Sequence, residues 1–213
     1  MIHHIYEINY LLYIFMICGV ITSSISGALR AIESKMDITG AILLAFLTSN
    51  AGGTIRDIIL GTTVFWIKDQ FYIWITLIIG SLSFIIIYFE KQFIGRKKIH
   101  TLLIVTDAMG LAAFSLAGVE KSLVMGQNDI TAILMGVWTA IGGGIIADII
   151  SNRIPLVFSQ ELYITVAFLG AICYLTLINF SVIHYFASVI AALLMILLRL
   201  YSVKYKWKFP IIP

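Results

Sequence analysis

The sequence predicts an all-α integral membrane protein with seven transmembrane helices, arranged as two inverted three-helix repeats followed by a seventh helix. The first observation is composition: 61% of the 213 residues are hydrophobic, 12% are charged, and the mean hydropathy is +1.02. Soluble domains are roughly half apolar and a quarter charged. The second is a series of apolar stretches, each long enough to cross a ~30 Å hydrocarbon core as a helix. The third is a motif of glycines followed by an aspartate, which occurs twice.

Seven stretches have the length and apolar character of a membrane span. They are expected at about 9–29, 40–61, 71–89, 101–119, 130–150, 162–178 and 182–199. The first ends before Arg30, the second and fifth contain the glycine motif, and the third and sixth carry no charge. The fourth contains Asp107, which we expect to be solvated near one end, and is followed by Glu120 and Lys121, which we expect to reach the membrane surface. A tight turn near 179–181 separates the last two spans.

The chain repeats itself after a shift of 91 residues. The shift aligns three pairs in the glycine motif: Gly52 with Gly143, Gly53 with Gly144, and Asp57 with Asp148. The DIT segment at 37–39 meets its copy at 129–131 only after a shift of 92, which predicts one inserted or lost residue. Three spans in each unit, an odd number, require the two copies to be inverted. We expect repeat one at about 9–90, repeat two at about 100–179 and an extra helix at about 182–200, all in one transmembrane domain, 1–213.

Positive charge predicts the orientation in the membrane. Loops 1, 3 and 5 and the C-terminal tail hold eleven Lys and Arg residues, whereas the opposite side holds only Lys68 and Lys121. The positive-inside rule then places the N-terminus outside and the C-terminus in the cytoplasm. The head, MIHHIYEIN, lacks a cationic region, so no cleavable signal peptide is expected. We expect a multi-pass protein of the cell (inner or plasma) membrane, whose basic tail contacts lipid head groups and not nucleic acid.

The glycine motifs are expected to interrupt their helices. In NAGGTIRD (50–57), Thr54 and Asp57 have the spacing of a capping box, so the helix is predicted to stop near Asn50 and restart at Thr54. The segment IGGGIIAD (141–148) is predicted to break likewise. Broken helices that face each other near the midplane are typical of permeation and binding sites. Freed carbonyls and nearby polar side chains would replace the water around a monovalent cation. Close helix packing through small residues is the alternative explanation.

Charged side chains this deep in a membrane need partners or water. Arg56 and Asp57 are neighbours that point about 100° apart on a helix, so we expect them not to pair with each other. We predict instead that Arg56 reaches Asp148 across the pseudo-two-fold axis, where the bridge either locks the two halves together or gates a path. Two intramembrane aspartates also suggest an aspartyl protease. The glycine spacing of those proteases and any nucleophile motif are absent, so no enzyme is expected.

Four segments carry a resemblance to a known family. They are SISGALRAI in the first span, AGGTIRDIILG followed by VFWIKD, TDAMGLAAFSLAGVEKSL in the fourth span, and GGGIIADII followed by Asn152, Pro155 and Tyr163. Together they resemble the bacterial branch of the trimeric intracellular cation channel (TRIC) family, over about residues 15–200. The resemblance implies homotrimers with a separate pore in each protomer, kinks at the glycine motifs, and permeation of potassium and, less selectively, sodium.

The expected site consists of the glycines at which the resemblance implies kinks and of the polar residues near them. The kinks that the resemblance implies fall at Gly52, Gly53, Gly142, Gly143 and Gly144. Polar residues expected to line or gate the pore are Thr48, Ser49, Asn50, Arg56, Asp57, Thr139 and Asp148. The chain departs from the family pattern at Ala51, Ala147 and Thr63, where a third glycine, a second arginine and a proline are usual. The missing arginine weakens any symmetric gate of two salt bridges.

The predicted function is therefore a potassium-permeable monovalent cation channel. The first alternative is a secondary transporter of a small zwitterion such as glycine, because inverted repeats and broken helices are also typical of transporters. The second is a non-transporting membrane scaffold, in which apolar residues could replace the buried charges without loss of flux. No metal site and no cofactor other than, at most, bound lipid is expected; the partners are two further copies of the chain, lipids and potassium or sodium ions.

Overall fold

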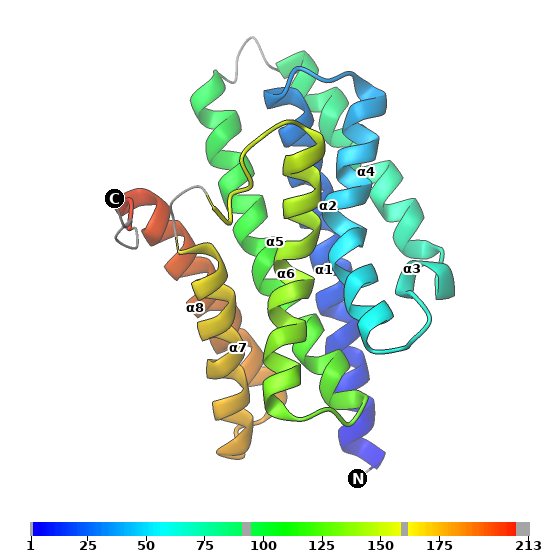
Figure 1. Cartoon of the computed structure of the whole chain (residues 1–213), viewed down its shortest axis with the longest axis vertical. Coiled ribbons are helices and arrows are strands. Elements are labelled where there is room, and N and C mark those ends of the chain that lie inside the picture. The colour runs from blue at the N-terminus through cyan, green and yellow to red at the C-terminus, as the bar shows by residue number, and fades with distance from the viewer. Residues whose placement is uncertain (1, 91–94, 159–161, 208–213) are drawn as a thin grey trace.

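The computed structural model describes the backbone of residues 2–90, 95–158 and 162–207, and the side chains of these ranges from residue 10 onward. The regular structure of this part of the chain is entirely helical (Figure 1). The helices are α1 (Ile2–Glu33), α2 (Ile38–Ile59), α3 (Phe65–Lys68), α4 (Phe71–Glu90), α5 (Arg96–Val124), α6 (Asp129–Ile150), α7 (Tyr163–Asn179) and α8 (His184–Tyr205).

The predicted all-α membrane architecture is confirmed. Within the described residues, six helices are long and apolar enough to cross a membrane, and α7, with 17 residues, is a shorter apolar helix. Each of the seven expected spans corresponds to one of these helices, whereas the short helix α3 was not predicted. A four-residue helix in the loop after α2 is too short to produce a periodic pattern of its own.

The helix α5 lies at the centre of the bundle. It packs against α1 and α6 on one side and against α7 and α8 on the other, and every residue from Gly110 to Glu120 is buried. Alanine, glycine and serine make up most of this stretch, which lets neighbouring helices approach closely. By contrast, α4 and α8 carry many exposed large apolar side chains, as expected of helices that face lipid.

The starts and ends of α2 and α6 match across the repeat. The side chains of Asp37 and Asn128 cap them, each accepting a hydrogen bond from the backbone amide three residues later. Both caps fit a shift of 91, so the predicted insertion between the DIT segments is wrong: DIT at 37–39 corresponds to residues 128–130. Each helix ends before a residue with positive φ, Gly61 and Asn152, which are again 91 residues apart. The amides of the following residues bond back to Asp57 and Asp148, as in a Schellman motif.

The helices α2 and α6 cross with their backbones in direct contact. A Cβ atom on Gly52 would collide with the carbonyl oxygen of Thr139, and a Cβ atom on Gly143 would collide with that of Thr48. The shift of 91 residues relates Gly52 to Gly143 and Thr48 to Thr139, so each of these two contacts is the counterpart of the other. Such reciprocity is the pattern that a two-fold axis between the helices produces, and α2 and α6 run in opposite directions in Figure 1.

The predicted interruption of these helices is wrong. Residues 38–59 and 129–150 each form one continuous helix. Thr54 does not begin a new helix, because its hydroxyl donates to the carbonyl oxygen of Asn50 within the same helix. Glycine permits a break but does not impose one, and here the missing side chains are used for the close crossing of α2 and α6.

Candidate functional site

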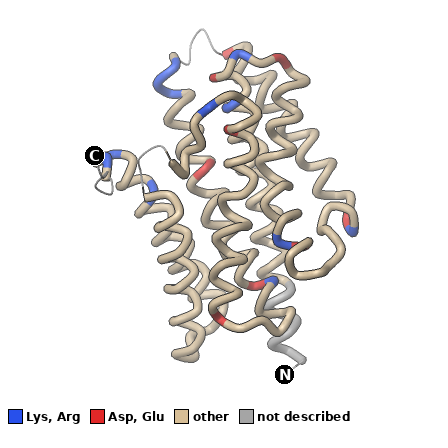
Figure 2. The backbone as a smooth tube through the Cα atoms, viewed as in Figure 1, with Lys and Arg blue, Asp and Glu red and all other residues tan. Residues whose placement is uncertain are grey.

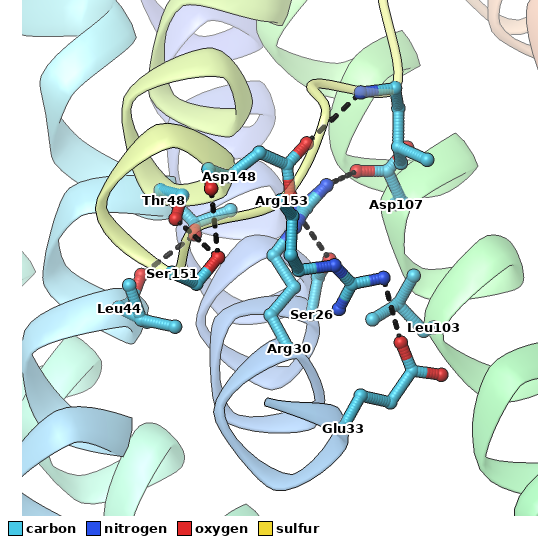
Figure 3. Close-up of polar contacts among 12 residues, drawn as sticks. Ser26, Arg30, Glu33, Leu44, Thr48, Leu103, Asp107, Asp148, Ser151 and Arg153 are labelled. Carbon is cyan, nitrogen blue, oxygen red and sulfur yellow. Dashed lines mark hydrogen bonds and ion pairs between the residues drawn. The ribbon is translucent and has the colours of Figure 1, made fainter. Parts of the chain in front are cut away.

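A buried arginine joins three helices at one end of the crossing. Arg30 of α1 is 0% exposed and bonds through Nη2 to Asp107 Oδ1 of α5 at 2.8 Å, and through Nε to Asp148 Oδ1 of α6 at 3.2 Å (Figure 3). Tyr163 lies beside this cluster: a Cβ atom on Gly144 would lie 3.6 Å from Arg30 Nη2 and 3.8 Å from the Tyr163 hydroxyl. One guanidinium is therefore shared by two carboxylates in the interior of the protein.

Asp148 also fixes the loop that follows its helix. Its Oδ2 accepts a hydrogen bond of 3.1 Å from the backbone amide of Leu156, eight residues later. One carboxylate oxygen thus faces Arg30 and the other stabilises the loop, so Asp148 has a structural role that is independent of any ion path.

The corresponding cluster of the first repeat lies at the opposite end of the crossing. Arg56 Nε and Nη2 both bond to Asp57 Oδ1 at 2.8 Å. Asp57 Oδ2 accepts a hydrogen bond of 2.8 Å from the amide of Phe65, again eight residues later. The Arg56 guanidinium carbon lies 5.8 Å from the centre of the Phe65 ring, and Lys121 of α5 is near enough for its charge to interact with both members of the pair.

Two predictions about these charges are wrong. Arg56 pairs with its neighbour Asp57, although adjacent residues were expected to point apart, and it does not reach Asp148, which pairs with Arg30 instead. The first error arises because the long arginine side chain can bend back along its own helix. The second arises because α2 and α6 run in opposite directions, so their C-terminal ends lie at opposite ends of the bundle (Figure 1).

The predicted pore-lining polar residues fall into two groups. Thr48 and Thr139 lie at the α2–α6 crossing, where each hydroxyl donates within its own helix. Ser49 and Asn50 instead face α4 and hydrogen-bond to the Thr76 hydroxyl, each at 3.1 Å. The structure therefore brings Thr48 and Thr139 together with the glycines and turns Ser49 and Asn50 away from them.

Three buried groups were missed or misplaced by the sequence argument. Asp107 was expected to be solvated, yet it is 5% exposed and paired with Arg30, which had been counted as a loop charge. Glu120 was expected to reach the surface, yet its side chain is 0% exposed, and its Oε1 lies 3.4 Å from Nδ1 of His184 in α8. A signal for Arg30 did exist, because the shift of 91 residues aligns it with Lys121 and so places a cation near the end of the first helix in each repeat.

A polar pocket lies outside the Arg30 cluster. Residues that line it include Glu33, Lys35, Arg96, His100 and Arg153. Glu33 bonds to Arg153 at 2.8 Å and to His100 at 3.1 Å. A second, narrow cavity is lined by Arg30, Gly144, Asp148 and Tyr163 and has no room for a water molecule. The first pocket is lined by residues that closely follow Arg30 in α1 and Asp148 in α6, so it lies beside this end of the crossing.

Comparison with known proteins places the chain in a family. A family model described as "Glycine transporter" matches residues 13–88 and 104–179, one match for each repeat. The chain is 37% identical to a UPF0126 membrane protein of Vibrio cholerae, over 94% of this chain and 82% of that protein. It is 34% identical to the UPF0126 inner membrane protein YadS of Escherichia coli K12, over 94% and 95% of the two chains. The chain belongs to the family that this model describes and to which it is joined by its UPF0126 relatives.

Solved structures connect the family to TRIC channels. The TRIC trimeric intracellular cation channel orthologue from Rhodobacter sphaeroides is 32% identical, with a TM-score of 0.84 over 91% of this chain and 97% of that one. A prokaryotic TRIC channel solved in 0.5 M KCl is 31% identical, with a TM-score of 0.83 over 92% and 98%. The resemblance to the bacterial TRIC branch is thus confirmed. These solved relatives are channels, which agrees with the expectation of a non-enzymatic protein.

Proposed function

We propose that this UPF0126 protein is a potassium-permeable monovalent cation channel of the cell inner membrane. The observation that carries the proposal is the Arg30–Asp107–Asp148 cluster, buried beside a polar pocket in a fold shared with solved cation channels. Ionisable groups inside a membrane bundle are expensive and usually mark ion pathways. The path would run within each protomer of a homotrimer, as the word "trimeric" in the description of the Rhodobacter relative suggests.

In this proposal, the close contact of α2 and α6 corresponds to a closed path. Gly52 and Gly143 hold α2 and α6 in backbone contact, and ion pairs lie at both ends of the crossing. Opening would separate the two helices at their glycines (Gly52 and Gly53 in α2, Gly142 to Gly144 in α6). That movement would expose the carbonyl and hydroxyl oxygens of Thr48 and Thr139, which suit a dehydrated monovalent cation. Asp57 and Asp148 would supply negative potential, and Arg56 would limit the retention of cations.

The repeats would be inverted in the membrane, with the N-terminus outside and the C-terminus in the cytoplasm. The distribution of Lys and Arg supports this orientation (Figure 2). Arg30, Lys35, Arg96 and Arg153 lie toward the end of the bundle where α1 and α6 terminate and α5 begins. That end would face the cytoplasm under the positive-inside rule, so the polar pocket would be the cytoplasmic mouth of the path.

Single-channel recording in planar bilayers under a potassium chloride gradient tests the proposal. We expect discrete current steps that reverse toward the potassium equilibrium potential. Asp148→Asn removes the charge beside Arg30 but retains an oxygen that can accept from Leu156, so we expect its unitary current or open probability to differ from that of the wild type. Silent bilayers containing folded wild-type protein would contradict the channel proposal.

Transport of a small zwitterion is the second candidate. The family model's description as a glycine transporter favours it, and Arg30 and the two aspartates together offer opposite charges to a carboxylate and an ammonium group. Uptake of labelled glycine into liposomes, saturable and competed by unlabelled glycine, would support this candidate. Linear, unsaturated flux with unitary current steps would exclude it. Unchanged flux after apolar replacement of Arg56, Asp57 and Asp148 would instead indicate a scaffold role for these charges.

A further inference from the structure

Arg30 is paired directly with two carboxylates, so these three groups include one more acid than base. Asp107 and Asp148 are 5% and 2% exposed, and their Oδ1 atoms bond to the same guanidinium. The three directly paired groups therefore carry a formal charge of −1. Arg199 of α8 approaches from another side, with its guanidinium carbon 4.6 Å from the centre of the Tyr163 ring.

The two oxygens that do not face Arg30 differ in their partners. Asp148 Oδ2 accepts from the amide of Leu156. Asp107 Oδ2 is fully buried and makes no hydrogen bond of good geometry with the described residues, and the nearest hydroxyl that could donate to Asp107 is that of Tyr163. A buried carboxylate oxygen without a donor is costly, and native proteins rarely tolerate one unless it has a function or an additional partner.

The surroundings of the Arg30 cluster are closely packed in this conformation, so a cation would enter only after a side chain moves. Gly144 presents no side chain to Arg30 and the Tyr163 hydroxyl, where an added Cβ would make only ordinary contact at 3.6 and 3.8 Å. The adjoining narrow cavity is closed in this conformation. Tyr163 also lies near enough to interact electrostatically with Asp107, so its hydroxyl is a second oxygen at the same place.

The first repeat has no equivalent acid. The shift of 91 residues aligns Asp107 with Met16 and Arg30 with Lys121. Met16 Sδ lies 3.5 Å from Arg56 Nη1, so a neutral sulfur occupies the place of the second carboxylate. On the same count of directly paired groups, Arg56 and Asp57 at the first-repeat crossing end sum to zero, and the charge of Lys121 acts on both of them. Asp107 therefore has no acidic counterpart in the first repeat, and the second carboxylate is found at only one end of the α2–α6 crossing.

We propose that Asp107 Oδ2 and the Tyr163 hydroxyl form a binding site for the permeating monovalent cation, reached from the polar pocket when Arg30 turns from Asp107 toward Asp148. A single positive charge neutralises the excess carboxylate, whereas a divalent cation would leave the cluster positive. The inference rests on the proposed channel function and assigns its cation preference to Asp107, a residue outside both glycine motifs.

Asp107→Asn tests the site, with Asp37→Asn as the matched control. Asp37 is exposed and caps α2 near the same end of the bundle, and asparagine caps a helix equally well. Reversal potentials in a potassium chloride gradient would be measured for both variants. We expect Asp107→Asn to reduce the potassium-to-chloride permeability ratio by about tenfold, the ratio that 1.4 kcal/mol of binding free energy produces. Asp37→Asn should match the wild type. Wild-type selectivity in Asp107→Asn would overturn the inference.

A binding measurement separates failure of the site from failure of the channel proposal. The melting temperature of detergent-solubilised wild type would be compared in potassium chloride and in N-methyl-D-glucamine chloride at equal ionic strength. The site predicts a higher melting temperature in potassium, and Asp107→Asn, or Asp107→Glu if the amide variant does not fold, should lose or alter the difference. This holds even if bilayers stay silent. Equal melting temperatures of the wild type in the two salts would reject the site, whatever the currents show.

Discussion

At the scale of single residues, Arg30 is the side chain on which most of the buried polar structure depends. It bonds to acids on two other helices and is itself 0% exposed. The desolvation cost of a buried ion pair can exceed its Coulomb energy, so such a pair is weak evidence of net stabilisation. Removing one partner of such a pair is strongly destabilising, because the remaining charge is left without a counter-charge in the interior. We therefore expect substitutions of Arg30 to lower the stability of the protein more than substitutions of most residues near the end of a helix.

We predict that Arg30→Gln lowers the free energy of unfolding by about 3–5 kcal/mol, the range found when one partner of a buried ion pair is removed. Two carboxylates would lose their shared counter-charge. The melting temperature in detergent measures the effect, and Lys35→Gln, at an exposed position five residues later, should change the stability by less than about 0.5 kcal/mol. The combined change Arg30→Gln with Asp107→Asn should recover part of the loss. Equal melting temperatures for Arg30→Gln and Lys35→Gln would contradict the role given to Arg30.

Sequence could indicate some of these residues but not their partners. Asp57 and Asp148 were found because the glycine motif repeats around them. Arg30 and Asp107 were not, because their importance comes from a contact between residues that are 77 positions apart. Hydropathy counts a charge near the end of a span as exposed, and only the packing of α1 against α5 shows that this end lies inside the protein.

At the scale of helices, the glycines of α2 and α6 act through packing. The reciprocal contacts of Gly52 and Gly143 with threonine carbonyl oxygens set how closely the two helices approach. Hydropathy located all seven long apolar helices, because long apolar stretches in a membrane have few alternatives to a helix. It could not decide between a broken helix and a close crossing, since both need glycine at the same positions.

We predict that Gly52→Ala and Gly143→Ala each destabilise the protein by about 1–3 kcal/mol, the usual cost of overpacking. The added methyl group meets a backbone oxygen that cannot rotate away, so α2 and α6 would be forced apart. Gly144→Ala is the control from the same motif, because its Cβ would lie 3.6 Å or more from its neighbours. Melting temperatures would rank the variants, with Gly144→Ala near the wild type. A larger loss in Gly144→Ala than in the other two would refute the packing explanation.

At the scale of the whole molecule, duplication explains the backbone better than it explains the charges. Caps, helix ends, aspartate-to-loop hydrogen bonds and glycine contacts all recur after 91 residues. The ion pairs do not: one cluster has two acids on one arginine, and the other has an arginine and a lysine near one acid. A symmetric scaffold thus carries two chemically different ends, and a channel built this way would differ in its two mouths.

The orientation of these two ends decides which mouth faces the cytoplasm. Positive charge gathers beside the Arg30 cluster, so we expect Lys35 in the cytoplasm and Lys68 outside. Both side chains are exposed in loops or at a helix end. In a background with Cys18 and Cys173 replaced by serine, Lys68→Cys in intact cells should react with a membrane-impermeant maleimide. Lys35→Cys should react only after the membrane is permeabilised. The opposite labelling pattern would invert the topology and place the acidic cluster at the outer mouth, while equal labelling of both sites in intact cells would indicate dual insertion.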